Sequence, residues 1–141
     1  MSLPDPERGL VVKYGYLWHA DARDGHQEGK DRPCLIVAVT AKDDGRVIAS
    51  VAPITHSQPR DSDSACPVPQ QTAHRLGLDH DQSWIVTTEV NRFEWPGADL
   101  RPVSRDRWTY GFMPSGLQQA VQDQLRENVA RQRLRATSRD E

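Results

Sequence analysis

Residues 32–55 read RPCLIVAVTAKDDGRVIASVAPIT, which is two apolar runs joined by a short polar turn. The first run, over 33–40, predicts a strand, because it is almost entirely apolar and because proline is tolerated at the first position of a strand. Asp43, Asp44 and Gly45 are residues that favour a tight turn between antiparallel strands. The second run, over 46–54, is then the return strand, and the stretch predicts a β-hairpin.

Other short runs of apolar and β-branched residues surround this hairpin and predict further strands. They cover 15–20, 66–69, 83–89, 91–95, 99–103 and 107–112, with one helical turn over 71–78. The run over 66–69 contains prolines, which favour a position at a sheet edge. Many short strands separated by polar loops, with no βαβ series, indicate an antiparallel arrangement.

The last periodic segment predicts a C-terminal helix over about 115–132. Ser115 and Gln118 have the spacing of a capping box at its start. Apolar residues then recur at helical spacing and form one stripe: Leu117, Ala120, Val121, Leu125 and Val129. The sequence therefore predicts a mainly β fold, a small antiparallel sheet or barrel with one helix laid against it.

The chain has 141 residues and a formal net charge of −2. One domain is expected, since ~100–150 residues is the commonest domain size. We expect a flexible arm over 1–13, a single domain over 14–134 and a frayed tail over 135–141. No run approaches the ~20 apolar residues of a membrane span, and the first residues lack the features of a secretory signal, so a cytoplasmic location without membrane contact is expected.

The two cysteines, Cys34 and Cys66, are too few for a disulfide scaffold and lack the spacing of a zinc site. Cys34 lies in an apolar run and is expected to be a buried, reduced thiol. The motifs of hydrolase nucleophile elbows, zinc proteases and phosphate-binding loops are absent from the sequence. Neither a metal ion nor another cofactor is expected.

A polar loop over 24–33, DGHQEGKDRP, is the first place where chemistry is expected. Arg32 lies at the junction of this loop and the following strand, where the sheet can hold it rigidly. A guanidinium held in this way binds phosphate through two parallel hydrogen bonds. The alternative is a solvated turn in which Arg32 pairs with a nearby acid.

The end of the return strand, Pro53-Ile54-Thr55-His56, is the second such place. Thr55 can donate a hydrogen bond to a phosphate oxygen, and histidine, here His56, is a common general acid or base. Strand alternation places these two side chains on opposite faces unless the strand ends between them. The alternative is a strand end capped by Thr55 with a surface histidine.

Four short stretches resemble one family when they are taken in order. They are Gly15-x-Leu17-Trp18, Gly25-His26, Arg32-Pro33-Cys34-Leu35-Ile36-Val37 and Pro53-Ile54-Thr55. Their order and separations resemble the MazF/PemK/Kid toxins of bacterial toxin–antitoxin pairs, in which a Gly-[Asp/Glu]-Ile-Trp strand leads into a Gly-x-Glu-Gln-x-Gly-x-Arg-Pro loop and a later Pro-x-Thr strand end. The stretch over 84–92 looks like a later strand of the family, and 91–101 looks like its PemK-like subgroup.

This resemblance implies a small SH3-like antiparallel barrel with a C-terminal α-helix, of the CcdB/PemK-like kind, acting as a homodimer. It implies a growth-inhibiting toxin whose partners are single-stranded RNA and a cognate antitoxin protein. Many relatives cut single-stranded RNA without a metal ion. Family antitoxins thread an acidic, partly disordered tail through the groove, which is typical of folding on binding.

Carried over residue by residue, the resemblance assigns catalytic roles to Arg32, Thr55 and His26. The implied reaction is attack of a ribose 2′-hydroxyl on its own phosphate, which needs a base, an acid and stabilisation of the phosphorane. Arg32 would supply positive charge and Thr55 a hydrogen-bond donor, while His26 or His56 would move protons. Further residues are expected to bind the substrate: His56, Glu28, Lys30, Glu89, Asn91 and Arg92. Tyr16 stands where relatives usually carry an acid.

Two features allow other interpretations. Trp18 and Trp84 lie within predicted strands, which favours core packing over base stacking. The tail arginines are interleaved with acids, which is typical of a solvated face, with contact to RNA or antitoxin as the alternative: Arg126, Arg131, Arg133, Arg135 and Arg139. A non-catalytic module that binds DNA, RNA or a protein partner on the same barrel is the alternative function, and a barrel whose groove serves only dimerisation is a third.

Overall fold

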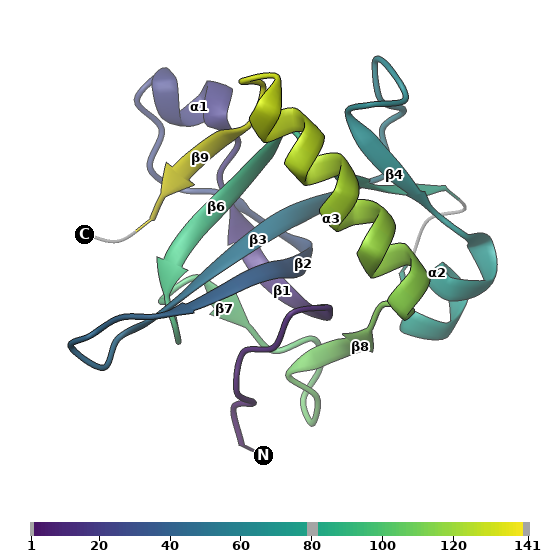
Figure 1. The fold of residues 1–141 in the computed structure, drawn as a ribbon. Coiled ribbons are helices and arrows are strands. Elements are labelled where there is room, and N and C mark those ends of the chain that lie inside the picture. The colour runs from purple at the N-terminus through teal and green to yellow at the C-terminus, as the bar shows by residue number, and fades with distance from the viewer. Residues whose placement is uncertain (1, 79–81, 140–141) are drawn as a thin grey trace.

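The computed structural model describes residues 2–78 and 82–139 and is mainly β, with one long helix (Figure 1). Its elements, in chain order, are β1 (Leu10–Tyr16), α1 (His19–Arg23), β2 (Lys30–Ala41), β3 (Val47–Thr55), β4 (Ala65–Val68), α2 (Gln70–Leu76), β5 (Ser83–Val86), β6 (Glu89–Glu94), β7 (Leu100–Arg101), β8 (Thr109–Phe112), α3 (Ser115–Ala130) and β9 (Arg135–Ser138).

Strands β2 and β3 form the predicted hairpin. Thr40 lies opposite Ile48 near the turn, and Cys34 lies opposite Pro53 near the open end. The Asp44 carboxylate closes the turn, since its Oδ1 accepts a hydrogen bond from the Arg46 amide at 3.1 Å. The register shifts by one residue between Ile36 and Ala38, which is a β-bulge and bends the strand.

The remaining described strands extend this hairpin into one sheet. Neighbours along the main path are β4, β5, β3, β2, β1 and β7, while β6 pairs with β3 and β8 pairs with β1. These pairings are antiparallel, and β9 adds a parallel pairing to the outer edge of β6. The predicted fold class is confirmed, and the sheet is open rather than closed into a full barrel.

Two apolar clusters lie on the two faces of this sheet, because successive residues of a strand point to opposite faces. Along β1, Val11 belongs to the cluster that includes Val121 of α3. Val12 and Tyr14 belong to the other cluster, where the Tyr14 ring stacks on Phe93 with ring centres 4.3 Å apart. Each face of the central strands is therefore buried.

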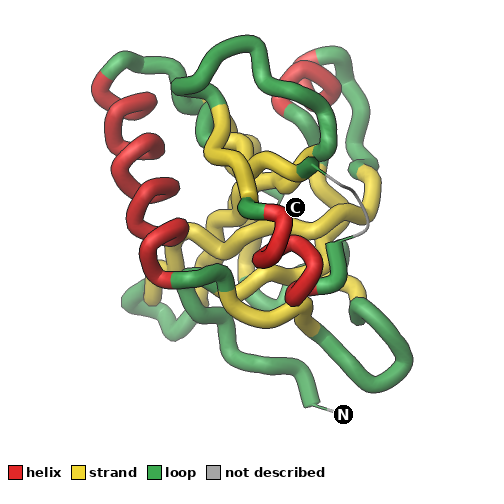
Figure 2. The backbone as a smooth tube through the Cα atoms, turned by 90° about the vertical axis from the view of Figure 1, so that its right-hand side faces the viewer, coloured by secondary structure: helices red, strands yellow, loops and turns green. Residues whose placement is uncertain are grey.

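Helix α3 runs along one side of the strands (Figure 2). Val121 and Leu125 are buried as predicted, but Val129 is 57% exposed and Ala120 is exposed as well. Asn128 takes the buried position, and its amide donates hydrogen bonds to the carbonyls of Thr87 at 2.9 Å and Asp63 at 3.0 Å. The apolar stripe is thus narrower than predicted and ends in a polar contact.

The start of α3 differs from the predicted capping box. Pro114 is the N-cap residue and no side chain caps the helix there. Gln118 instead donates from Nε2 to the carbonyl of Met113 at 2.7 Å. Neither α3 nor any other helix in the described part of the chain is long and apolar enough to cross a membrane.

The described residues near both ends of the chain form more regular structure than the sequence predicts. The first strand is β1 rather than 15–20, so it begins inside the expected arm, and α1 already begins at His19. The indole N–H of Trp95 donates a hydrogen bond to the carbonyl of Pro4 at 3.2 Å, which holds the segment before β1 against the rest of the fold. At the other end, the frayed tail expected from residue 135 onwards is replaced over 135–138 by β9.

Candidate functional site

Arg32 lies near the start of β2, opposite Tyr14 of β1. Its guanidinium carbon is 5.1 Å from the centre of the Trp18 ring, within the range of a cation–π contact. Within the described residues Arg32 makes no ion pair, and its buried Nε has no hydrogen-bond partner. The alternative of an arginine paired with a nearby acid is therefore wrong, and the neighbouring carboxylate of Asp31 lies 4.0 Å from Arg101 instead.

Thr55 is the last residue of β3, the strand that pairs with β2, on which Arg32 lies. Because Cys34 lies opposite Pro53, the same register carried two residues further places residue 55 opposite residue 32. The Thr55 Oγ1 accepts a hydrogen bond from the Ser57 amide at 3.1 Å, which orients the hydroxyl. No described residue takes the hydroxyl proton, so Thr55 can still donate to a ligand.

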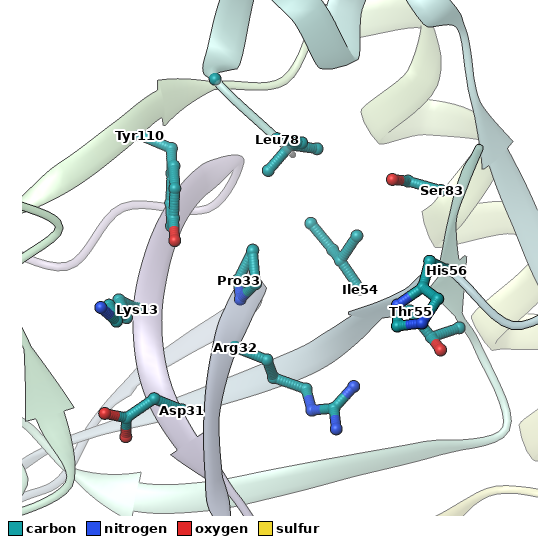
Figure 3. A pocket seen from close by; sticks show the side chains of 11 residues that line it. Lys13, Asp31, Arg32, Pro33, Ile54, Thr55, His56, Leu78, Ser83 and Tyr110 are labelled. Carbon is teal, nitrogen blue, oxygen red and sulfur yellow. The ribbon is translucent and has the colours of Figure 1, made fainter. Parts of the chain in front are cut away.

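Two cavities share Arg32, Thr55 and His56, and we call this pair the Arg32 cleft. The first has a volume of about 350 Å³ and is also lined by Lys13 and Tyr110. The second has a volume of about 480 Å³ and continues to Trp18, Arg60 and Thr88. Figure 3 shows Arg32, Thr55 and His56 around the first cavity, with the Arg32 guanidinium on the same side as Thr55 and His56. The structure thus brings together two of the three predicted catalytic residues.

The third predicted catalytic residue, His26, lines a different cavity. This cavity, of about 310 Å³, also contains Glu28, Lys30 and Trp18, and it meets the Arg32 cleft at Arg32. The loop around His26 is held by a hydrogen bond from the His26 amide to the Asp21 carbonyl at 3.0 Å. His26 and Thr55 therefore each line a cavity together with Arg32, but they do not share one.

The three predicted binding residues from the later strand fall in different places. Glu89 accepts hydrogen bonds at Oε1 from the Tyr16 hydroxyl and the His19 amide, both at 2.9 Å, and it lines a cavity of about 700 Å³ that also holds Trp18. Asn91 is fully buried and bonds both backbone groups of Leu17, at 2.9 Å and 2.8 Å. Arg92 is exposed on β6 and lines none of these cavities. Asn91 therefore stabilises the backbone at Leu17, and neither Asn91 nor Arg92 lines the Arg32 cleft.

Burial sets the protonation of the groups beneath the cleft. The pKa of Tyr16 is raised well above its ordinary range, mainly by burial and then by the neighbouring Glu89 carboxylate. Burial also raises the pKa of the Cys34 thiol, and Cys34 and Cys66 are both free and buried. Tyr16 and Cys34 therefore remain neutral at physiological pH and place no negative charge of their own beside Arg32.

Sequence reasoning missed the role of Trp18, which was assigned to the core. The residue is half-buried and packs against the second apolar cluster as predicted, but it also lines two cavities together with Arg32 and the adjoining cavity of about 700 Å³. Trp18 comes two residues after β1 ends, where strand alternation no longer predicts the side-chain direction. Arg60 was also missed, because it lies in a polar loop with no local pattern.

Among residues 2–78 and 82–139, no group of three or more His, Cys, Asp and Glu side chains is placed to hold a metal ion. The groups that line the Arg32 cleft include the Arg32 guanidinium, the Thr55 hydroxyl, the His56 imidazole and the Trp18 indole. Such a set can bind an anion and move protons.

Comparison with protein families agrees with this fold and with the resemblance of residues 15–57. A family model described as "PemK-like, MazF-like toxin of type II toxin-antitoxin system" matches residues 13–129, which run from within β1 to the end of α3 and include both sides of the Arg32 cleft but not β9. A search of curated proteins finds no match. The chain belongs to the PemK-like, MazF-like toxins of type II toxin–antitoxin systems.

Proposed function

We propose that this toxin is an endoribonuclease that cuts single-stranded RNA without a metal ion, and that the reaction takes place in the Arg32 cleft. The observation that carries the proposal is the state of Arg32. Its guanidinium lies over Trp18 with no acid paired to it in the described part of the chain, and its Nε is buried without an acceptor. An unpaired buried donor costs free energy, and an oxyanion ligand is the group that would relieve this cost.

A phosphate bound at Arg32 would also reach Thr55. The two residues lie on neighbouring strands in register and line the same two cavities. Arg32 would neutralise charge that develops on the phosphorane, and Thr55 would donate a hydrogen bond to a second oxygen. Donors held in advance where charge develops are a large source of catalysis, because they need no reorganisation during the reaction.

The proposed reaction needs one group to remove a proton and one to supply it. The ribose 2′-oxygen attacks the phosphorus and loses its proton to a base, and the bond to the 5′-oxygen breaks as that oxygen gains a proton from an acid. The products are a 2′,3′-cyclic phosphate and a 5′-hydroxyl. His56 in the cleft and His26 in the adjoining cavity are the candidate groups.

Single-stranded RNA fits the surroundings of the cleft. Trp18 offers an indole beside the phosphate position, and bases of unpaired RNA stack on such rings. Arg60, Arg133 and Arg135 line the adjoining cavity of about 700 Å³ and can bind flanking phosphates. As a member of a type II toxin family the protein is expected to have an antitoxin partner, and we further propose that it acts as a homodimer and resides in the cytoplasm.

The test is cleavage of a single-stranded RNA by purified protein in EDTA, with the ends of the products identified as cyclic phosphate and hydroxyl. Arg32→Ala should lower the cleavage rate by about 10²–10³, which corresponds to about 2.7–4 kcal/mol for the loss of one oxyanion donor. Arg46→Ala, at the hairpin turn and paired with Asp44, is the matched control and should cut at the rate of the unaltered protein. Salt-sensitive binding of RNA without cleavage would support a binding module instead and would overturn the enzymatic proposal.

A further inference from the structure

We propose that Arg139 is a positioning residue that holds the Arg32 cleft in its binding geometry. Arg139 follows β9 and its side chain is only 7% exposed. Its guanidinium donates to Asp99 Oδ2 at 2.9 Å, to the Gly15 carbonyl at 2.6 Å and to Asn91 Oδ1 at 3.2 Å. We call these contacts, together with one to the Gln27 carbonyl at 3.4 Å, the Arg139 clasp.

The first arm of the clasp leads to Trp18. Asn91 is fully buried, and the amide that Arg139 contacts also bonds the backbone N–H and carbonyl of Leu17. Leu17 is the residue before Trp18, and the Trp18 ring lies under the Arg32 guanidinium. Arg139 and Asn91 therefore fix the backbone from which the platform for Arg32 projects.

The second arm leads to the loop that carries His26 and Glu28. Arg139 donates to the carbonyl of Gln27, which lies between them. The loop then passes so close to β1 that a Cβ atom at Gly29 would lie 2.2 Å from the Tyr16 carbonyl oxygen. The loop is thus held against β1 at Gly29 and against the C-terminal segment at Gln27.

The clasp also explains why β9 stays on the sheet. The strand has four residues, three of them exposed, and a short edge strand of this kind gains little from burial. The Arg139 guanidinium is buried, with one carboxylate and three further acceptors, and its carbon lies 5.7 Å from the centre of the Tyr14 ring. A buried charge that satisfies this many partners is an anchor, and it links the C-terminal segment to both sides of Arg32.

The experiment uses the full chain labelled with 5-fluorotryptophan and observed by fluorine NMR, with the Trp18 signal assigned from Trp18→Phe. Arg139→Ala should move or broaden the Trp18 signal and leave the Trp84 signal in place, because Trp84 lies on β5, outside the clasp. Arg139→Lys keeps a charge beside Asp99 but cannot make the forked contacts, so it should disturb Trp18 less. In the RNA assay, cleavage should fall by about tenfold or more in Arg139→Ala, since small misplacements of reacting groups are costly.

The control for lost stability is Leu125→Ala, a buried residue of α3 in the other apolar cluster. It should lower the melting temperature while the Trp18 signal and the cleavage rate stay as in the unaltered protein. An unchanged Trp18 signal in Arg139→Ala, or the same change in Leu125→Ala, would overturn the proposal. The inference rests on the proposed function only for the cleavage readout. If the unaltered protein cuts no RNA, that function fails, and the fluorine signal still decides whether the clasp positions Trp18.

Discussion

At the scale of single residues, Tyr16 connects burial to pH dependence. Its hydroxyl donates to Glu89 at 2.9 Å, and burial, followed by that carboxylate, raises the pKa of Tyr16 above its ordinary value. The folded protein thus favours the neutral phenol, whereas the unfolded chain ionises near pH ~10. The stabilising contribution of Tyr16 is fully present below that pH and is lost as the pH rises above it, by up to about 1.4 kcal/mol per pH unit.

Thermal unfolding of the unaltered protein and of Tyr16→Phe, followed by circular dichroism from pH 7 to pH 11, checks this prediction. The difference in melting temperature between the two proteins should be constant up to about pH 9.5 and should then change in favour of Tyr16→Phe. The buried thiol of Cys34, whose pKa is also raised, is common to both proteins and cancels in the comparison. Parallel curves through pH 11 would show that Tyr16 ionises freely in the fold.

The location of a site residue was predictable from sequence where its side chain lies at the end of a strand. Arg32 and Thr55 were found from their positions at strand ends, and they share the cleft. Asn91 was misjudged because an asparagine within a strand has the same local pattern whether it contacts a ligand or, as here, bonds the backbone of Leu17, 74 residues away along the chain. Partners at that separation are set by the tertiary fold.

At the scale of elements, the bulge in β2 decides which residue faces Arg32. Near the turn, Thr40 pairs with Ile48, and a regular hairpin with this register would bring residue 56 opposite residue 32. The shift between Ile36 and Ala38 moves the pairing by one, so that residue 55 takes this place. The apolar runs of the sequence predict the hairpin, but they do not show that its register shifts by one residue. Strand alternation alone therefore could not decide which of Thr55 and His56 lies directly opposite Arg32, and both residues line the cleft.

The turn between α3 and β9 has a strained residue whose replacement should stabilise the protein. Gln132 has a φ of 58°, in the left-handed region, where a Cβ atom is unfavourable. Gln132 follows the end of α3, and its amide donates a hydrogen bond to the Val129 carbonyl at 3.0 Å. The amide of the next residue, Arg133, donates to the Asn128 carbonyl at 2.8 Å. Glycine is the usual residue at this position of a helix end.

We therefore expect Gln132→Gly to raise the free energy of unfolding by about 0.5–1 kcal/mol, the relief of strain being partly offset by the greater freedom of the unfolded chain. Gln132→Ala keeps the Cβ atom and should give no such gain. Urea denaturation of the three proteins measures the difference. Equal gains for glycine and alanine would place the effect in the lost side chain and not in the backbone conformation.

At the scale of the whole molecule, the sheet is shared by two apolar clusters and by the site. The fold class follows from continuous apolar runs and turn residues, because the central strands bury both of their faces. The strand β9 could not be foreseen, since its residues have little to bury and its place depends on parallel pairing with β6 and on Arg139. The local sequence pattern predicts the strands of the sheet. It does not predict the long-range contacts of β9 and Arg139.

Because the same strands supply both clusters, we expect the two faces to unfold together. Leu125→Ala removes apolar contact on the α3 face, and Phe93→Ala removes the ring that stacks on Tyr14 on the other face. Each should lower the free energy of unfolding by about 2–5 kcal/mol, as large-to-small changes in packed cores do. In urea, far-ultraviolet circular dichroism and tryptophan fluorescence should give coincident single transitions for both variants. A fluorescence transition that precedes the loss of β structure in Phe93→Ala alone would mean that the two faces unfold separately, since Trp95 packs on Phe93 with ring centres 5.9 Å apart.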